Sequence, residues 1–290
     1  MNAGGRRPTL NAGGRRPTLN KDTRLCISLA ARPSNIGTRF HNYLYDLLGL
    51  DFIYKAFTTT DIAAAIGGVR ALGIRGCSVS MPFKQDVIEL VDDVEQSAAS
   101  INAVNTIVND TAVPGGHLTA SNTDYLAVAR LIAEHGLQPS QSVLFRGSGG
   151  MASAVTAAFR DNGFHRGTLV ARNPDTGRAL AERLDYEYAA EVGDRTADVI
   201  VNITPVGMAG GPEEHDLAFD ATTIDAAHTV FDVVALPSET PLITAARAAG
   251  IAVITGAEVI ALQAAEQFER YTGVRPTTEQ IAAASAVSRA

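Results

Sequence analysis

Short apolar runs alternate with helix-length amphipathic stretches along almost the whole chain after Thr23. The runs of strand length are Leu25–Ala30, Phe52–Phe57, Gly76–Ser80, Val143–Arg146, Thr168–Ala171, Asp198–Ile203, Val230–Val234 and Ala252–Ile254. The stretches with a helical period include Gly37–Leu48, Thr60–Leu72, Ala152–Asn162 and Leu242–Ala249. Because strands joined through helices normally pair in parallel, this alternation predicts an α/β protein with parallel sheets.

Two features interrupt the alternation near residue 110. The runs Ala103–Val108 and His117–Ala120 are separated by a Val-Pro-Gly-Gly segment, which is typical of a hairpin or bent strand pair. The stretch Thr123–His135 then has a helical pattern and begins in the capping residues Ser-Asn-Thr-Asp. A chain of 290 residues is long enough for two medium domains, and this helix is placed to connect them.

Composition and charge exclude several classes of protein. The formal net charge of −7 argues against a nucleic-acid-binding surface. No apolar run is long enough to span a bilayer, and the N-terminus lacks the apolar core of a signal peptide. The two cysteines, Cys26 and Cys77, fall in predicted buried strands, where a free thiol is the usual state. We therefore expect a cytoplasmic protein that binds neither membranes nor nucleic acid; its oligomeric state stays open.

The first residues repeat a nine-residue segment, since Asn2–Leu10 and Asn11–Leu19 both read NAGGRRPTL. Two short copies cannot build a repeat architecture, which needs several units that share a core. We interpret residues 1–20 as a disordered tail and leave them out of the fold prediction.

The second half opens with a phosphate-loop pattern. The strand Val143–Arg146 leads directly into Gly147, Gly149 and Ala152, the G-x-G-x-x-A form of the dinucleotide fingerprint. Glycines permit the tight turn and let backbone N–H groups approach a pyrophosphate, which the N-terminus of the following helix also attracts. Strand, loop, helix and second strand follow in the required order, so we predict a dinucleotide site rather than a plain tight turn.

Arg172 bears on the choice of cofactor, because it follows the second strand of this unit. An acidic residue there binds the ribose 2′-hydroxyl of NAD, whereas an arginine suits the 2′-phosphate of NADP. We therefore predict NADP in preference to NAD. Asp175 nearby keeps NAD as an alternative, and a solvated surface arginine is the simplest alternative role for Arg172.

Lysine is rare in this chain and occurs only at positions 21, 55 and 84. Lys84 lies in the segment SVSMPFKQDV, just past an apolar run and Pro82, where we expect a helix to begin with Phe83 packed beneath it. An amine can lose its proton at accessible pH and a guanidinium cannot, so a retained lysine fits proton transfer. The alternative is an ordinary solvated cation on a first helical turn.

Taken together, the motifs resemble those of shikimate dehydrogenases, most closely the shikimate dehydrogenase-like branch. The matching segments, in order from about Arg24 to the end, are SVSMPFK, INAVNTI, SNTDYLA, GSGGMA, VNITPVGM and TGAEVIALQAAEQF. The resemblance implies an α/β substrate-binding domain over residues 21–124 and 257–290, with the C-terminal helices returning to it. It implies an NADP-binding Rossmann domain over residues 125–256, with substrate in a cleft between the two.

The resemblance also implies roles for particular residues. Lys84 and Asp124 match the catalytic pair of the family, and proton removal from a secondary alcohol needs such a base near the hydroxyl. Which of the two carries the proton stays open. Implied substrate contacts are Ser80, in place of the usual threonine, Asn105 and Gln263. Implied cofactor contacts are Gly147, Ser148, Gly149, Gly150, Met151, Ala152, Arg172, Thr204 and Gly256.

Two departures affect the substrate. Where the family carries two serines that bind the substrate carboxylate, this chain has Asn35 and Gly37, with Ser34 and Thr38 alongside. Ala235 stands where a tyrosine is usual, which implies a roomier pocket. The histidines lack paired spacing for a metal ion. The leading hypothesis is an NADP-dependent oxidoreductase acting on a cyclic hydroxy acid related to shikimate or quinate, with shikimate itself a poor substrate. The alternative is a binding protein that senses NADP or a metabolite with little turnover.

Overall fold

The computed structural model of the protein describes residues 16–289, which form two compact units. One unit contains the described chain up to Thr123 and the chain from Ala261 onward, and the other is Asp124–Ile260. The domain boundaries expected from the sequence, after residues 124 and 256, lie one and four residues from these.

Most of the predicted disordered tail, residues 1–15, lies outside the described residues. The first described residue, Arg16, donates hydrogen bonds to Asn42 Oδ1 at 3.1 Å and to the carbonyl of Phe52 at 3.2 Å. Arg16 also pairs with Asp46 at 3.2 Å. Residue 16 is therefore attached to the first unit.

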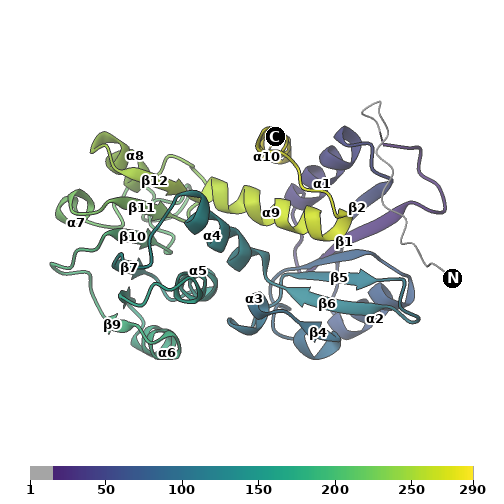
Figure 1. Cartoon of the computed structure of the whole chain (residues 1–290), viewed down its shortest axis with the longest axis horizontal. Coiled ribbons are helices and arrows are strands. Elements are labelled where there is room, and N and C mark those ends of the chain that lie inside the picture. Colours follow the sequence, from purple (N-terminus) through teal and green to yellow (C-terminus); the bar gives the residue numbers. More distant parts are fainter. Residues whose placement is uncertain (1–15, 290) are drawn as a thin grey trace. The chain divides into compact units, whose positions relative to one another are not determined.

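The first unit is built on a six-stranded sheet with the order β2-β1-β3-β5-β6-β4 (Figure 1). Its strands are β1 (Arg24–Ala30), β2 (Phe52–Thr58), β3 (Gly76–Val79), β4 (Asp93–Val94), β5 (Thr106–Asp110) and β6 (His117–Ser121). Its helical elements are α1 (Ile36–Leu47), α2 (Ile62–Ala71), η1 (Ile88–Leu90), α3 (Gln96–Ala99), the later part of α9 (Gly256–Thr272), and α10 (Thr278–Arg289). Strands β2, β1 and β3 are parallel, whereas β5 runs antiparallel to both β3 and β6.

The β5–β6 pair confirms the hairpin predicted from the sequence. Its turn contains Gly115 and Gly116, both with positive φ, a conformation that side chains with a Cβ rarely adopt. The backbone N–H of Gly116 closes the turn on the carbonyl of Val113 at 2.8 Å.

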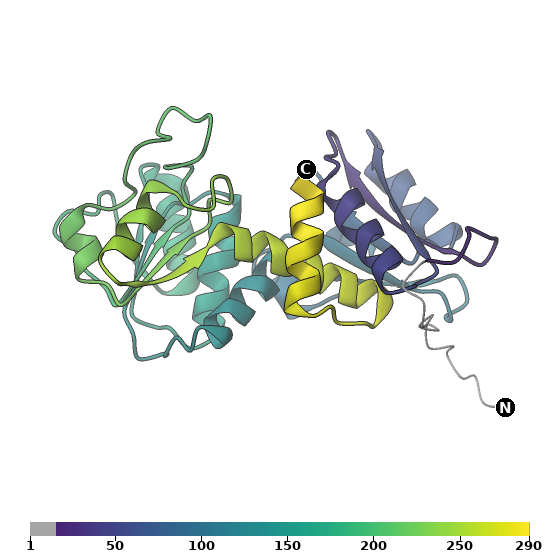
Figure 2. The ribbon, with the colours of Figure 1, turned by 90° about the horizontal axis from the view of Figure 1, so that it is seen from above.

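Both faces of this sheet are covered by helices. On one face, Phe40 and Leu44 of α1 pack with Phe268 and Tyr271 of α9, and α10 lies beside α1 (Figure 2). On the other face, α2 and the segment around Phe83 cover the strands. Asp61 starts α2 by accepting the backbone N–H of Ala64 at 2.9 Å, the usual capping interaction.

The second unit contains a six-stranded, fully parallel sheet with the order β12-β11-β10-β7-β8-β9. Its strands are β7 (Val143–Arg146), β8 (Gly167–Val170), β9 (Glu187–Ala189), β10 (Val199–Asn202), β11 (Thr229–Asp232) and β12 (Ala252–Thr255). The helices are α4 (Thr123–Glu134, from its second residue), α5 (Gly150–Asp161), α6 (Pro174–Leu184), α7 (Ala221–Asp225), α8 (Pro241–Ala248) and the start of α9. Counted within the unit, the strand order is that of the Rossmann fold, so the predicted two-domain α/β class is confirmed.

Helices α6 and α8 of the second unit begin at side-chain caps. Asn173 accepts the backbone N–H groups of Asp175 and Thr176, with Pro174 in the first turn of α6. Thr240 caps α8 in the same way ahead of Pro241. These caps fix where each helix meets the carboxyl edge of the sheet.

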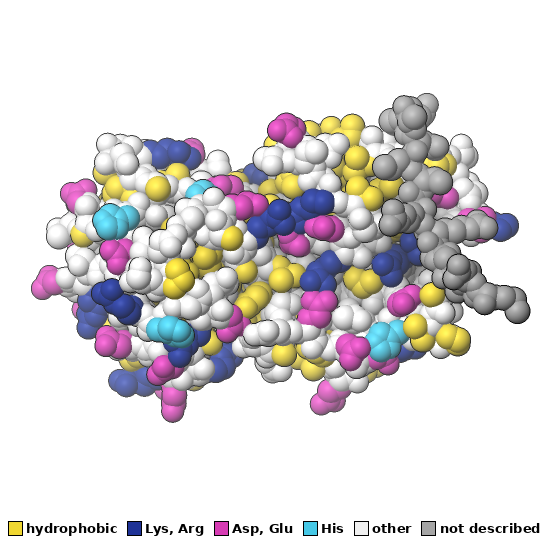
Figure 3. Space-filling view, in the orientation of Figure 1, with side chains coloured by type: hydrophobic (Ala, Val, Ile, Leu, Met, Phe, Trp, Pro, Cys, Tyr) yellow, Lys and Arg dark blue, Asp and Glu magenta, His cyan; other side chains and the backbone are white. Residues whose placement is uncertain are grey.

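The two cysteines are free and buried, as expected, and burial raises the pKa of the Cys26 thiol to about 12. No helix between residues 16 and 289 is both long and apolar enough to cross a lipid bilayer. On the face drawn in Figure 3, Lys and Arg side chains are interspersed with Asp and Glu.

Candidate functional site

One edge of the first sheet gathers most of the predicted substrate and catalytic residues. The register pairs Leu29 of β1 with Val79 of β3, Ser78 of β3 with Thr106 of β5, and Thr106 with Ser121 of β6. The carboxyl ends of β1, β3 and β6 therefore meet the amino end of β5. The segments that leave this edge carry Ser80, Lys84, Asn105 and Thr123.

The segment that carries Lys84 is not the helix that the sequence predicted. Residues 81–87 form consecutive turns, and the short helix η1 begins only at Ile88. The carbonyl of Lys84 accepts the N–H of Val104 at 2.7 Å, while Ile88 N–H donates to Gln85. Because Ile88 N–H bonds to Gln85 and not to Lys84, the hydrogen-bond ladder of an α-helix is not formed here. Phe83 is buried in the core as expected, which leaves Lys84 half-buried at the sheet edge.

Asn105 is the centre of a buried hydrogen-bond network. Its Oδ1 accepts the backbone N–H of Thr123 at 2.8 Å, the Thr123 hydroxyl at 3.0 Å and the Thr106 hydroxyl at 2.8 Å. Gln263 of α9 donates from Nε2 to the Thr123 hydroxyl at 3.0 Å. Gln267, one turn further along α9, donates to the Thr106 hydroxyl at 3.0 Å. Asn105 and Gln263, more than 150 positions apart in the chain, thus share one network.

Asp124 directly follows Thr123 and lies in the first turn of α4. The helix dipole stabilises a negatively charged side chain at a helix N-terminus, so this position favours a carboxylate. The structure leaves Asp124 half-buried. Its catalytic role stays a proposal.

The start of α1 supplies the residues that replace the family's serines. Asn35 is exposed and its side chain makes no capping bond to the helix. Ser34 is also exposed, and its Oγ accepts the N–H of Ile36 at 3.4 Å, so its hydrogen remains available to a ligand. Among the described residues, the buried Thr38 hydroxyl has no hydrogen-bond partner. A Cβ on Gly37 would meet the hydroxyl oxygen and ring of Tyr54 at ordinary contact distances of 3.5–3.8 Å, so the position has room for a Cβ.

The phosphate loop of the second unit has the backbone geometry its glycines predict. Gly147 has a φ of 125°, and a Cβ there would lie 2.8 Å from the carbonyl oxygen of Ile203. Gly149 caps α5 and Gly150 begins it; a Cβ on either would meet nothing within 4 Å. The loop therefore packs against β10 on one side and leaves open space at the helix N-terminus on the other.

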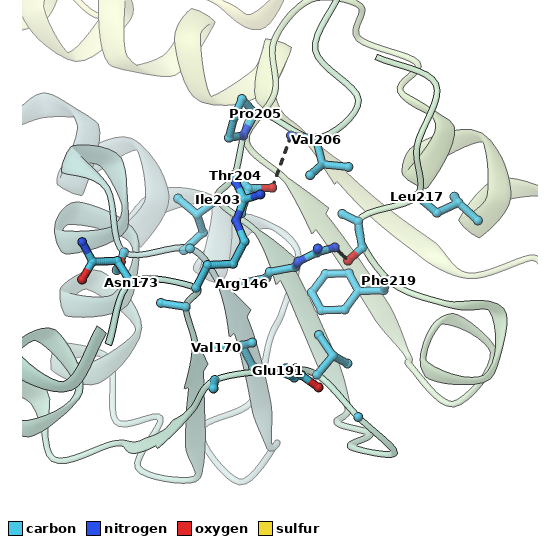
Figure 4. Close-up of a pocket in the computed structure, with 18 of the residues that line it drawn as sticks. Arg146, Val170, Asn173, Glu191, Ile203, Thr204, Pro205, Val206, Leu217 and Phe219 are labelled. Carbon is cyan, nitrogen blue, oxygen red and sulfur yellow. Dashed lines mark hydrogen bonds between the residues drawn. The ribbon is translucent and has the colours of Figure 1, made fainter. Parts of the chain in front are cut away.

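This loop borders a cavity of about 810 Å³ that lies entirely within the second unit (Figure 4). The cavity is lined by residues 146–149, 170–173, 190–194, 203–206 and 217–220. These segments follow neighbouring parallel strands, and β7 and β10 flank the point where the strand order reverses. Ligands of doubly wound sheets bind at that point.

Three predicted cofactor residues line this cavity with polar groups: Ser148, Arg172 and Thr204. Arg172 is largely exposed, with 78% of its side chain accessible, and lies 3.7 Å from Glu213. The Thr204 hydroxyl donates to Asn202 Oδ1 at 2.6 Å and accepts the N–H of Val206 at 3.3 Å. Thr204 thus shapes the loop, because its hydroxyl hydrogen is already used within the protein.

Arg146 was missed by the sequence prediction. It ends β7 and extends into the cavity beside Phe219, where its guanidinium donates to the carbonyl of Ala218 (Figure 4). Burial lowers the pKa of Arg146, and the carboxylate of Glu213 opposes that effect; an arginine nevertheless stays protonated at neutral pH. A cation at the end of an otherwise apolar strand, directly before the first glycine, was the signal that could have found it.

Four other predicted cofactor residues do not line the cavity: Gly150, Met151, Ala152 and Gly256. Ala152 is fully buried in the first turn of α5, where a small side chain permits close packing. A Cβ on Gly256 would lie 2.4 Å from the carbonyl oxygen of Val233. Packing alone therefore explains the glycine at 256. Between residues 16 and 289, no group of His, Cys, Asp or Glu side chains could hold a metal ion.

Comparison with known proteins agrees with this geometry. Residues 35–107 match the family model described as the shikimate dehydrogenase substrate binding domain. The chain is 55% identical to a shikimate dehydrogenase-like protein of Haemophilus influenzae over 269 residues, which is 93% of this chain and 98% of that protein. The chain belongs to the shikimate dehydrogenase family. It is also 36% identical to an NADP(+) shikimate dehydrogenase of Chlorobium phaeobacteroides, over 84% of this chain and 89% of that one.

Solved structures of family members show the same fold. The structure of a shikimate 5-dehydrogenase-like protein matches with a TM-score of 0.91 and 55% identity, covering 94% of this chain and all of that one. A quinate dehydrogenase from Corynebacterium glutamicum, solved with NAD, matches with a TM-score of 0.80 and 28% identity over 91% of this chain and 98% of that one. The likeness thus covers both units of this oxidoreductase family.

Proposed function

We propose that the chain is an NADP-dependent oxidoreductase that interconverts a secondary alcohol and a ketone on a cyclic hydroxy acid related to shikimate or quinate. The observation that carries this proposal is the edge of the first sheet. There the segment of Lys84, the buried amide of Asn105 and the amide of Gln263 are gathered by strand register and hydrogen bonds. A polyhydroxylated ring needs such amides for its hydroxyl groups and one base for the hydroxyl that is oxidised.

In the proposed reaction, the bound nicotinamide ring supplies the acceptor for the hydride. The side chains of the protein hold the substrate and move its proton. Lys84 takes the hydroxyl proton as the carbon–hydrogen bond breaks and returns it in the reverse direction, which an amine can do and a guanidinium cannot. Asp124 is the proposed partner of Lys84 in this proton transfer.

We assign the cavity of the second unit to the adenosine half of NADP. The open space at the N-terminus of α5 suits a pyrophosphate, because free N–H groups and the helix dipole both favour an anion. Two arginines, Arg172 and Arg146, line this cavity and are the cations that we assign to a 2′-phosphate, with Glu213 close to both. The lining also contains Glu191, Asp194 and Asp220, so the preference for NADP rests on the two guanidinium groups and not on the overall charge of the cavity. The cofactor-binding roles of Gly147, Ser148, Gly149 and Gly150 follow from the same placement.

The carboxylate end of the substrate site is proposed to differ from that of a shikimate dehydrogenase. Asn35 and Gly37 replace two hydroxyl groups, and the enclosed Thr38 hydroxyl cannot take their place without a rearrangement. Ser34 remains the available hydroxyl donor. We therefore expect shikimate to bind weakly and a related acid to be the better substrate. The two free, buried cysteines support a cytoplasmic location.

The test is a turnover screen with NADP⁺ and NAD⁺ against shikimate, quinate, aminoshikimate and truncated relatives. We expect reduction of NADP⁺ with at least one cyclic hydroxy acid and a smaller rate with NAD⁺. If none is oxidised while NADP⁺ binds normally, the chain is a binding protein and the oxidoreductase proposal is wrong.

A further inference from the structure

Thr123 is a fully buried hydroxyl that contacts both amides of the substrate site. Its Oγ1 lies 3.0 Å from Asn105 Oδ1 and 3.0 Å from Gln263 Nε2. Because water is excluded, each of these two contacts is made by one donor and one acceptor. The Thr123 hydroxyl also lies 3.2 Å from that of Thr106, but both hydroxyl hydrogens point to Asn105 Oδ1, so none is left for that contact. The network therefore determines which way each amide points.

The orientation of the Asn105 amide follows from the backbone. The N–H of Thr123 can only donate, and it lies 2.8 Å from one terminal atom of the Asn105 side chain. That atom must be the carbonyl oxygen. It also accepts the Thr106 hydroxyl, so three donors converge on Oδ1. What Asn105 has left for a ligand is its NH₂ group, which donates.

The orientation of Gln263 follows from that of Asn105. The carbonyl Oδ1 of Asn105 carries no hydrogen, so the hydrogen in its 3.0 Å contact with Thr123 comes from the threonine hydroxyl. Thr123 Oγ1 then has only lone pairs to offer Gln263, which must present its NH₂ group to the network. What Gln263 has left for a ligand is its carbonyl oxygen, which accepts.

We propose that Thr123 is a positioning residue that fixes these two amides in opposite senses, so that the substrate must supply an acceptor at Asn105 and a donor at Gln263. Two hydroxyl groups meet this requirement, and so does a hydroxyl with an amine at the Gln263 position. A keto or ether oxygen at Gln263 does not. The proposal rests on the proposed function, since it describes how that substrate site recognises the hydroxyl groups of the substrate that are not oxidised.

Fluorine offers a direct test, because it is close to a hydroxyl in size but cannot donate a hydrogen bond. We would measure kcat and KM for the best substrate and for analogues in which each hydroxyl that is not oxidised is replaced by fluorine. In the parent protein, one analogue should lose about tenfold or more in kcat/KM, because Gln263 is left without a donor. The analogue fluorinated at the Asn105 position should lose about threefold, since fluorine is still a weak acceptor.

Thr123→Val and Thr123→Ser make a matched pair for this assay. Valine keeps the shape and removes the hydroxyl, which frees the Gln263 amide to rotate. The difference between the two analogues should then fall to within about twofold. Serine restores the hydroxyl and should restore the difference. Equal penalties in the parent, or a full difference in a folded Thr123→Val variant, would overturn the proposal.

A second measurement needs no substrate and separates this inference from the proposed function. Side-chain amide protons of Gln263 are followed by ¹⁵N NMR for exchange with solvent. We expect one Nε2 proton to exchange at least about tenfold more slowly in the parent and in Thr123→Ser than in Thr123→Val. Equal exchange in all three proteins refutes the network, whatever the turnover assays give. Slow exchange in a protein that oxidises no hydroxy acid would leave the amide directions standing and refute only the oxidoreductase proposal.

Discussion

Removing either arginine from the cavity of the second unit should weaken the binding of NADP far more than the binding of NAD. The variants are Arg172→Ala and Arg146→Leu, the second chosen because leucine fills part of the space of a half-buried arginine beside Phe219. Each removes a cation that we assign to the 2′-phosphate, which NAD lacks. The rest of the cavity stays as it is.

The size of each loss follows from burial. A hydrogen bond to a charged group contributes about 1.5–3 kcal/mol, which is roughly a tenfold to hundredfold change in affinity. The Arg172 side chain is 78% exposed and already lies near Glu213, so we expect about 1.5 kcal/mol, or roughly tenfold. Arg146 is less exposed, and we expect about 2–3 kcal/mol, or roughly 30- to 150-fold.

The assay is calorimetric titration of the parent and both variants with NADP⁺, NAD⁺, 2′,5′-ADP and 5′-AMP. The losses should appear with NADP⁺ and 2′,5′-ADP, while NAD⁺ and 5′-AMP change by less than about threefold. Glu213→Gln is the matched control, because it removes the competing carboxylate and should tighten both phosphorylated ligands. Equal losses for all four ligands would mean that the arginines only support the loop, and the cofactor assignment would fail.

Three further changes test other parts of the account. Gly147→Ala should destabilise the protein by about 1–3 kcal/mol in urea unfolding and abolish NADP⁺ binding, because a Cβ would lie 2.8 Å from Ile203 O at a φ of 125°; unchanged stability would refute this. The double change Asn35→Ser with Gly37→Ser should lower the KM for shikimate by about tenfold or more, as two donors to a carboxylate are added; no gain in a folded variant would mean that Ser34 already serves. Burial lowers the pKa of His41 to about 4, so the unfolded chain takes up its proton first as pH falls below 6.5, and the parent should lose about 2 kcal/mol of stability between pH 7 and pH 5 that His41→Phe does not lose. Parallel pH curves for the two proteins would contradict the neutral, buried histidine.

The strands were the most predictable part of the fold. Val143–Arg146 was predicted to the residue, because its first three residues are apolar, as in a buried parallel strand, and the following glycines mark its end. The strand Glu187–Ala189 was missed because it is a short edge strand without an apolar run. Two consecutive glycines after Pro114 marked the hairpin turn.

The features that could not be predicted from the sequence depend on contacts between residues far apart in the chain. In place of the helix expected at Pro82 the chain forms turns, and the carbonyl of Lys84 there accepts the N–H of Val104, twenty residues away. The sequence predicted Arg146 only as the last residue of a strand. Its hydrogen bond to the carbonyl of Ala218, which directs the side chain into the cavity, forms only in the folded unit. The sequence marked Thr123 only as a residue near a helix start, because its part in the site depends on contact with Gln263 of α9, far along the chain.

The most direct test of the central claim is Lys84→Arg, which keeps the positive charge and removes the accessible deprotonated amine. The measurement is kcat with the best substrate of the turnover screen, alongside NADP⁺ affinity. We predict that kcat falls by about 10²–10⁴-fold, the usual contribution of general acid–base catalysis, while NADP⁺ affinity changes by less than about twofold. Turnover by the arginine variant at nearly the parent rate would contradict a proton-transfer role for Lys84.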